Sequence, residues 1–417
     1  MAEASVMRRA TANPLLLRML LALAMWLTCA LEFEAQKKEE VRHNDPRNCP
    51  YCHGDPALMK ASGLVSHYGF AFSTKDTARI DEFMPSVELV WAETEHFRLG
   101  MYLPSIKMNA GEREKYEREL TRLNAALPEV SIKTKVFDSW LRLHLYALRV
   151  EDVYARMLKM YAVEQSDFPA TAQQWTMQGK YMGEGPHMGQ SDKYEVLVLP
   201  TKQIFTDFLR THYGVQTSST QRWNVATRGS LNVTIHLEQG ALRRDSALHG
   251  HIGFNLAHML WDGYKFYAYD TPAWIREGLA HVVEREIDPK YNSFDASEGA
   301  GADMSTKENW LGEVRALIKK GTAPRLAELV ALKTFAEFKL AHHYTTWSMI
   351  DYMLKEHAAA FAQFAGKLKG RINAEGRSDG SRMIEFHRDA FRECFKMGYS
   401  EFDAAWQAWV LAIEVPK

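Results

Sequence analysis

The fold of this chain is decided by two stretches in its second half, FNLAH at residues 254–258 and TPAWIREGLA at residues 271–280. The apolar spacing around the first stretch predicts a helix from about Asp245 to Trp261. Pro272 opens a second predicted helix, Trp274–Glu286, because a proline in the first helical turn has no amide hydrogen to lose. The sequence therefore places a histidine on one helix and a glutamate on the next.

The second stretch resembles the helix that carries the third zinc ligand of gluzincin peptidases. Its Trp-x-x-Glu-Gly-Leu-Ala pattern, with Glu277 19 positions after His258, is similar in particular to the peptidase MA-like group of exported proteins. Residues 344–352 resemble that group's tyrosine-bearing helix, and the C-terminal stretch 390–406 resembles its final pattern. In a gluzincin, a helix with a His-Glu-x-x-His motif supplies two zinc ligands and the general base.

The chain departs from that pattern at two positions. Phe254 stands where the first histidine ligand belongs, and a phenyl ring cannot bind a metal. Asn255 stands where the general base belongs, and an amide cannot take a proton from water near neutral pH. The resemblance then implies only His258 and Glu277 as metal ligands and Tyr344 as a donor to the transition state. We expect Phe254 to point into the core or plug the old metal cavity, while His258 and Glu277 face each other.

His281 is a candidate third ligand, because it follows Glu277 by four residues and shares its helix face. A zinc site of His258, Glu277 and His281 is geometrically feasible, although gluzincins usually have an outer-shell residue at that later position. The favoured interpretation is simpler: His258 and Glu277 form a hydrogen-bonded pair between two helices, and no cofactor is bound. His342 and His343, at the start of a later helix, are candidates to face a cleft, but exposed paired histidines at a helix start are more often incidental, and that is the expectation here.

These residues predict a non-catalytic exported protein, a pseudopeptidase that binds a peptide or protein ligand or serves as a scaffold. One alternative is a zinc-dependent metallohydrolase or peptidase with an atypical ligand set. Another is a c-type haem or thiol redox protein that works through the CPYCH segment at residues 49–53.

Cys49, Cys52 and His53 form the Cys-x-x-Cys-His pattern by which c-type haem is attached, through two thioethers and an axial histidine. A haem needs an enclosing helical shell, whereas the residues that follow, between Tyr68 and Tyr102, are predicted to form a few short strands. The remaining uses are a thiol redox pair, a local disulfide, or a structural metal knuckle completed by His53 or His67.

The N-terminus predicts export. Arg8 and Arg9 precede the apolar run Met19–Leu31, about 13 residues long and shorter than the roughly 20 that a membrane-spanning helix needs. We therefore predict a signal peptide at residues 1–30, with a retained anchor as the alternative. The mature protein is expected in the periplasm, in the cell envelope or outside the cell, with no membrane span.

The charge balance argues against a nucleic-acid partner, because the formal net charge is -1 and the pI is about 7.0. The predicted fold class is α+β. We expect a small irregular Cys-containing region at residues 31–105, a helical segment at 106–190, and a mainly helical gluzincin-like domain with an edge β-sheet at 191–417. Strands are predicted at Tyr194–Leu199 and Leu231–Leu237.

Overall fold

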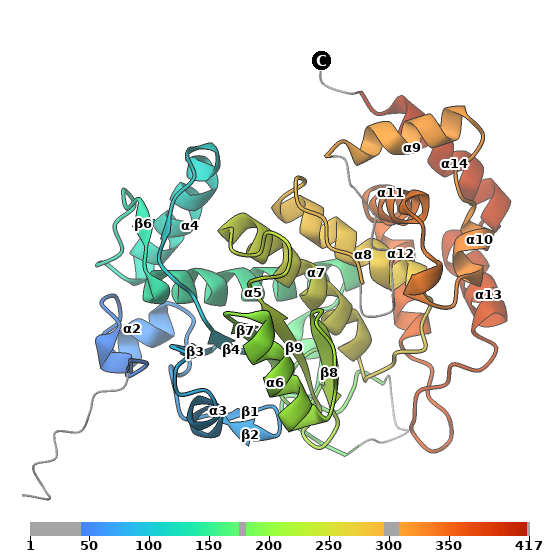
Figure 1. Ribbon diagram of the computed structural model, residues 1–417. Helices are drawn as coiled ribbons and strands as arrows, with labels where there is room; N and C mark the ends of the chain where they lie inside the picture. Colours follow the sequence, from blue (N-terminus) through green and yellow to red (C-terminus); the bar gives the residue numbers. More distant parts are fainter. Residues whose placement is uncertain (1–42, 175–180, 296–307, 415–417) are drawn as a thin grey trace, which may run out of the picture.

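The computed structural model of this protein describes residues 43–174, 181–295 and 308–414. These residues form a mainly helical α+β fold, as the sequence predicts (Figure 1). The predicted signal peptide at residues 1–30 lies outside them. None of the described helices combines the length and the apolar character that a membrane crossing requires.

A five-stranded mixed sheet lies at the centre, with the strand order β3-β4-β7-β9-β8. The inner pairs β4–β7 and β7–β9 are parallel, whereas the two edge strands run antiparallel to their neighbours. The inner strands are rich in apolar residues because both of their faces are covered. The strands are β3 (Val90–Glu93), β4 (Phe97–Met101), β7 (Tyr194–Leu199), β8 (Gln221–Val225) and β9 (Ser230–His236).

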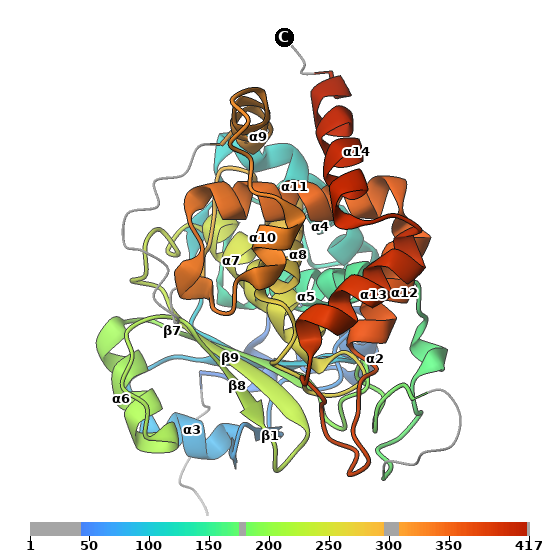
Figure 2. The same cartoon turned by 90° about the vertical axis from the view of Figure 1, so that its right-hand side faces the viewer.

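Helices cover both faces of this sheet (Figure 2). On one face lie α3 (Thr77–Phe83) and α6 (Lys202–Tyr213), and on the other lie the long helix α5 (Ser139–Tyr161) and α7 (Asp245–Gly263). Gly100 of β4 lets the ring of Trp91 lie against the strand, because a Cβ at this position would stand only 2.3 Å from Cζ3 of Trp91. On the opposite face, α5 and α7 pack against the sheet and against each other.

The C-terminal half is a layered set of helices built on α7, which is buried on nearly every side and therefore lacks a polar face. It packs between the sheet and α8 (Ala273–Ile287), and α8 packs in turn against α11 (Leu340–Glu356). The surrounding elements are α9 (Trp310–Lys319), α10 (Leu326–Ala331), η5 (Phe335–Glu337), α12 (Ala358–Leu368), α13 (Met383–Phe395) and α14 (Tyr399–Ala412).

The N-terminal part, residues 43–138, packs against the N-terminal end of α5 (Figure 1). Strands β3 and β4 of the central sheet come from this part, so the sheet joins both halves of the chain. Its other elements are η1 (Pro46–Asn48), α2 (Pro56–Ala61), β1 (Ala71–Phe72), β2 (Lys75–Asp76), β5 (Ile106–Lys107), η2 (Ala110–Glu112), α4 (Arg113–Ala126) and β6 (Val136–Phe137), and η3 (Gln165–Asp167) follows α5.

A buried ion-pair cluster fixes the start of α7 on α5. Asp245, the first residue of α7, accepts hydrogen bonds from Arg142 at 2.9 Å and from Arg149 at 2.8 Å, both on α5. The hydroxyls of Tyr116 and Tyr146 donate to the same carboxylate at 2.8 and 3.0 Å. All three charged side chains are at most 3% exposed, so the orientation of α7 relative to α5 is strongly specified.

Candidate metal centre

Three helices bring a carboxylate and three imidazoles together in the interior of the C-terminal half. His258 comes from α7, Glu277 and His281 from α8, and His343 from α11. The side chains of all four are fully buried. Gly278 permits this close packing of α8 on α11, because a Cβ there would lie 2.6 Å from Ile350 and 2.9 Å from the carbonyl oxygen of Thr346.

Glu277 lies at the centre of this group. Its Oε2 is 3.2 Å from Nε2 of His258. Its Oε1 is 3.3 Å from Nε2 of His281 and 3.0 Å from Nδ1 of His343. The facing of His258 and Glu277 that the sequence predicts is therefore present, and His281 joins the same carboxylate as the helical spacing suggests.

Several polar atoms of this group lack a hydrogen-bond partner, although Nε2 of His281 and Nδ1 of His343 form a hydrogen bond of 3.1 Å. Both oxygens of Glu277 and both ring nitrogens of His258 lack a partner with hydrogen-bond geometry, despite the short distances. Buried polar atoms are rarely left in this state. The ligand atoms of Glu277, His281 and His343 all lie within 4.8 Å of one another, so the three side chains are positioned to hold a metal ion.

The electrostatics of the group keep Glu277 ionised. Burial opposes its negative charge, but His258, His281 and His343 hold its pKa well below the usual range. Burial also lowers the pKa of His258 and of His343, which favours neutral imidazoles. A neutral imidazole and an ionised carboxylate are the protonation states in which these residues bind a metal.

His281 differs from the other two imidazoles because a second carboxylate faces it. Burial lowers its pKa, but Glu277 and Glu284 outweigh burial and raise it. Nδ1 of His281 is 3.6 Å from Glu284, and Glu284 accepts the backbone N–H of Ser293 at 2.8 Å. Nδ1 of His281 forms no hydrogen bond with this outer carboxylate, and the raised pKa favours a charged ring, in contrast to the neutral imidazoles of His258 and His343.

Phe254 and Asn255 stand at the two positions where the sequence departs from the gluzincin pattern. The Phe254 ring is buried, with its centroid 4.8 Å from that of His258 and 5.3 Å from that of His281. It therefore fills the space beside the ligands, as expected. The Asn255 amide donates to the carbonyl of His251 at 2.9 Å and accepts from Arg222 at 2.8 Å. Its side chain thus has a structural role on α7.

The other candidate residues lie elsewhere or turn another way. The ring of Tyr344 packs on Trp310 at a centroid distance of 4.8 Å. Its neighbour His343 is the residue that reaches Glu277. The expectation that His343 is an incidental exposed residue is wrong, because it is fully buried. The one sequence signal for it was its place one residue before the predicted tyrosine.

The CPYCH segment divides into two buried cysteines and an exposed histidine. Cys49 and Cys52 are unpaired thiols at 0% exposure, whereas the side chain of His53 faces solvent. The two thiols meet His67 and His144 in a second group that could hold a metal ion. His67 had a sequence signal as a partner for the knuckle, but His144 had none.

No protein-family model matches this chain, and no curated protein matches it either.

Proposed function

We propose that this chain is an exported, gluzincin-like pseudopeptidase that binds a peptide or protein ligand and does not hydrolyse it. The observation that carries the proposal is the Phe254 ring packed against His258 and His281 in a fully buried ligand group. Export rests on the sequence of residues 1–31, and the relation to gluzincins rests on the Glu277 helix.

Hydrolysis at a metal requires an open coordination position for water and a base beside it. Around Glu277, the described side chains bury the group completely, so water has no access to a coordination position. The base position is held by Asn255, whose oxygen is already bound to Arg222. The ligand group itself is sealed from solvent, with Phe335 packed on the far side of His258 at a centroid distance of 5.6 Å.

A metal ion would fit this group without serving hydrolysis. Glu277, His281 and His343 would hold it, with His258 on the second oxygen of the carboxylate. Zinc is the ion that a set of imidazoles and one carboxylate favours. Such an ion would supply positive charge next to Glu277 and fasten α8 to α11.

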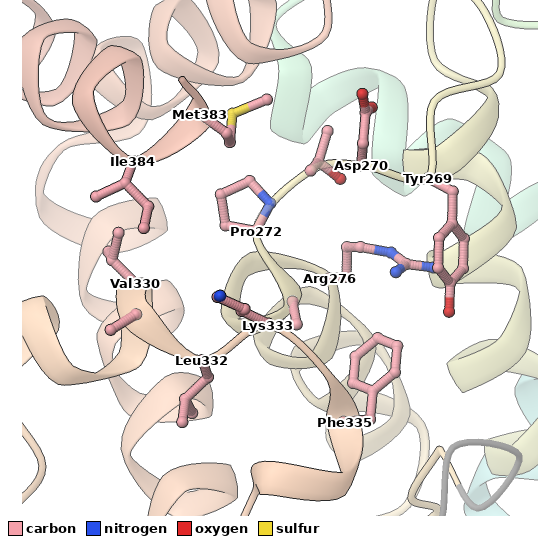
Figure 3. Close-up of a pocket in the computed structure, with 13 residues that line it drawn as sticks. Tyr269, Asp270, Pro272, Arg276, Val330, Leu332, Lys333, Phe335, Met383 and Ile384 are labelled. Carbon is pink, nitrogen blue, oxygen red and sulfur yellow. The ribbon is translucent and has the colours of Figure 1, made fainter. Parts of the chain in front are cut away.

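The binding function is assigned to the pocket next to this group, at the start of α8 (Figure 3). The pocket has a volume of about 270 Å³ and is lined mainly by apolar side chains, including Leu332, Phe335 and Ile384. Arg276 adds one buried cation, which is paired with Asp262 at 2.9 Å. Because Phe335 lines the pocket and also packs on His258, a ligand here would reach the phenyl ring and not the carboxylate. This composition suits an apolar peptide side chain.

The test is a peptidase assay on the full mature chain, loaded with zinc and incubated with unfolded protein and mixed peptide substrates. We expect no cleavage above that of a Glu277→Gln variant, with or without chelator. Cleavage by the wild type that both the chelator and Glu277→Gln abolish would refute the proposal and establish the zinc hydrolase instead.

A restoration variant sharpens this test. Phe254→His combined with Asn255→Glu places a second imidazole one turn before His258 and a carboxylate beside it. We expect a higher zinc affinity than in the wild type, because two imidazoles one turn apart can share one ion. An unchanged zinc affinity would count against the inferred descent of α7 from a metal-binding helix.

A further inference from the structure

Four buried donor atoms converge where the N-terminal segment meets α5. Sγ of Cys49 is 3.4 Å from Nε2 of His144, and Sγ of Cys52 is 3.1 Å from Nε2 of His67. All four donor atoms lie within 4.8 Å of one another. The four residues are at most 1% exposed, and both cysteines are reduced.

The spacing approaches that of the ligands of one tetrahedral zinc ion, with one S···N distance of 3.4 Å and a second, slightly shorter one of 3.1 Å. With Zn–S bonds of about 2.3 Å and Zn–N bonds of about 2.0–2.1 Å, neighbouring ligand atoms are about 3.4–3.8 Å apart. Two separate thiol–imidazole hydrogen bonds would explain each pair, but not why both pairs meet at one point inside the protein. Two sulfur and two nitrogen ligands in this geometry select zinc over harder metals such as calcium or magnesium.

The surrounding backbone orients the ligand atoms of His67 and Cys52. Nδ1 of His67 lies 3.0 Å from the carbonyl oxygen of Trp91, so Nδ1 carries the proton and the lone pair of Nε2 faces the cysteines. His53 and Gly54 both adopt left-handed backbone conformations, with φ of 52° and 68°. This turn brings the N–H of Gly54 to the sulfur of Cys52.

The position of the group indicates a structural role. Cys49 and Cys52 flank a turn before α2, His67 lies in the segment after α2, and His144 lies in the second turn of α5. One ion would therefore connect three chain segments, of which the cysteine turn and α5 also meet in a small apolar cluster. A set of four protein ligands leaves no open position, which is the property of structural and not of catalytic zinc.

We propose that Cys49, Cys52, His67 and His144 bind one zinc ion in a closed tetrahedral site that fastens the N-terminal segment to α5. This site accounts for both cysteines of the CPYCH segment without a haem. The histidine that a c-type haem would use, His53, points to solvent and lies outside the group.

Cobalt substitution of the mature chain tests the proposal and separates this site from the His–Glu group. Only sulfur ligands give a thiolate-to-cobalt charge-transfer band, and the group around Glu277 has none. We expect the band in the wild type and in His281→Ala, and its loss in Cys52→Ser and His144→Ala. His53→Ala is the matched control, because it changes the adjacent histidine of the same segment, and it should retain the full band.

Zinc content gives the second measurement. Cys52→Ser should lose one equivalent of zinc per chain relative to the wild type, and His53→Ala should lose none. If the Cys52→Ser protein does not fold, zinc released from the wild type by a mercurial thiol reagent gives the same information, with one equivalent expected. No charge-transfer band in the wild type, a band that survives Cys52→Ser, its loss in His53→Ala, or a Soret band would each overturn the proposal.

Discussion

Asp245→Asn is the most informative single substitution for the stability of this fold. Asparagine keeps the size of the side chain and one carbonyl acceptor, so the change removes charge without opening a cavity. The affected carboxylate joins Arg142 and Arg149 of α5 to the first residue of α7. Since α7 carries His258 and α5 carries His144, the substitution also tests what fixes the relative position of the two groups that could hold a metal ion.

The expected loss of stability depends on which hydrogen-bonding partners Arg142 and Arg149 keep in the variant. Arg149 retains Glu119, 2.7 Å away, whereas Arg142 retains only the carbonyl oxygen of Pro104 at 2.6 Å. Breaking a buried ion pair by removing one partner costs about 3–5 kcal/mol. Because one of the two guanidiniums keeps a carboxylate, we expect the lower end, about 3 kcal/mol. That corresponds to a change of about a hundredfold in the unfolding equilibrium constant.

The assay is urea unfolding at pH 7, followed by tryptophan fluorescence and circular dichroism. The matched control is Asp152→Asn, which breaks another arginine–aspartate pair of α5, with Arg122 at 2.7 Å. Both side chains of that pair are about half exposed, so its loss should cost at most about 1 kcal/mol. Equal losses in the two variants would refute the argument that burial makes the Asp245 pair strong.

The pH dependence supplies an independent check. Burial opposes ionisation of Asp245, but Arg149 and Arg142 hold its pKa far below the ordinary value of 3.8. A carboxyl with a lowered folded-state pKa contributes stability in full above its unfolded pKa and loses it as the pH falls. The stability difference between the wild type and Asp245→Asn should therefore be constant near neutrality and shrink below about pH 4.

Two further substitutions test other parts of the fold. Gly100→Ala should destabilise the protein by about 1–3 kcal/mol, because the new Cβ would lie 2.3 Å from Cζ3 of Trp91; an unchanged melting temperature would contradict this. Burial lowers the pKa of Lys369 to about 7. Between about pH 7 and pH 9 the unfolded chain then binds more protons than the folded chain, so the stability of the wild type should rise with pH. Lys369→Met should lack that rise, and equal pH slopes in the two proteins would show that Lys369 is not buried neutral.

Local sequence patterns predicted the elements well where periodicity was strong. The strand expected at Tyr194–Leu199 is β7 with the same bounds, and the helix expected at Trp274–Glu286 is α8, one residue longer at each end. Alternation and helical spacing reflect which faces become buried, so they are readable from the chain. The pairing of β4 with β7 could not be predicted from local sequence patterns, because it depends on contacts between residues nearly a hundred positions apart.

The candidate site likewise contains some residues that helical spacing predicts and others that it does not. Glu277 and His281 share a helix face, so their proximity follows from spacing alone. His343 had one signal, its place directly before Tyr344, and His144 had none, so spacing identified neither as a member of its group. Each is a histidine on a helix, and only its burial against other segments distinguishes it from a packing residue.

The sequence by itself determined the mainly helical α+β class and the shared helix face of Glu277 and His281, because both follow from short-range spacing. The facing of His258 and Glu277 was implied only by the resemblance of residues 271–280 to a known helix. The tertiary structure alone decided that His343 completes one ligand group and that His67 and His144 meet Cys49 and Cys52 in the other. The physical reason is that ligand groups form where separate segments pack together, and the cost of burying their polar atoms is met only by partners that the fold brings from far along the chain.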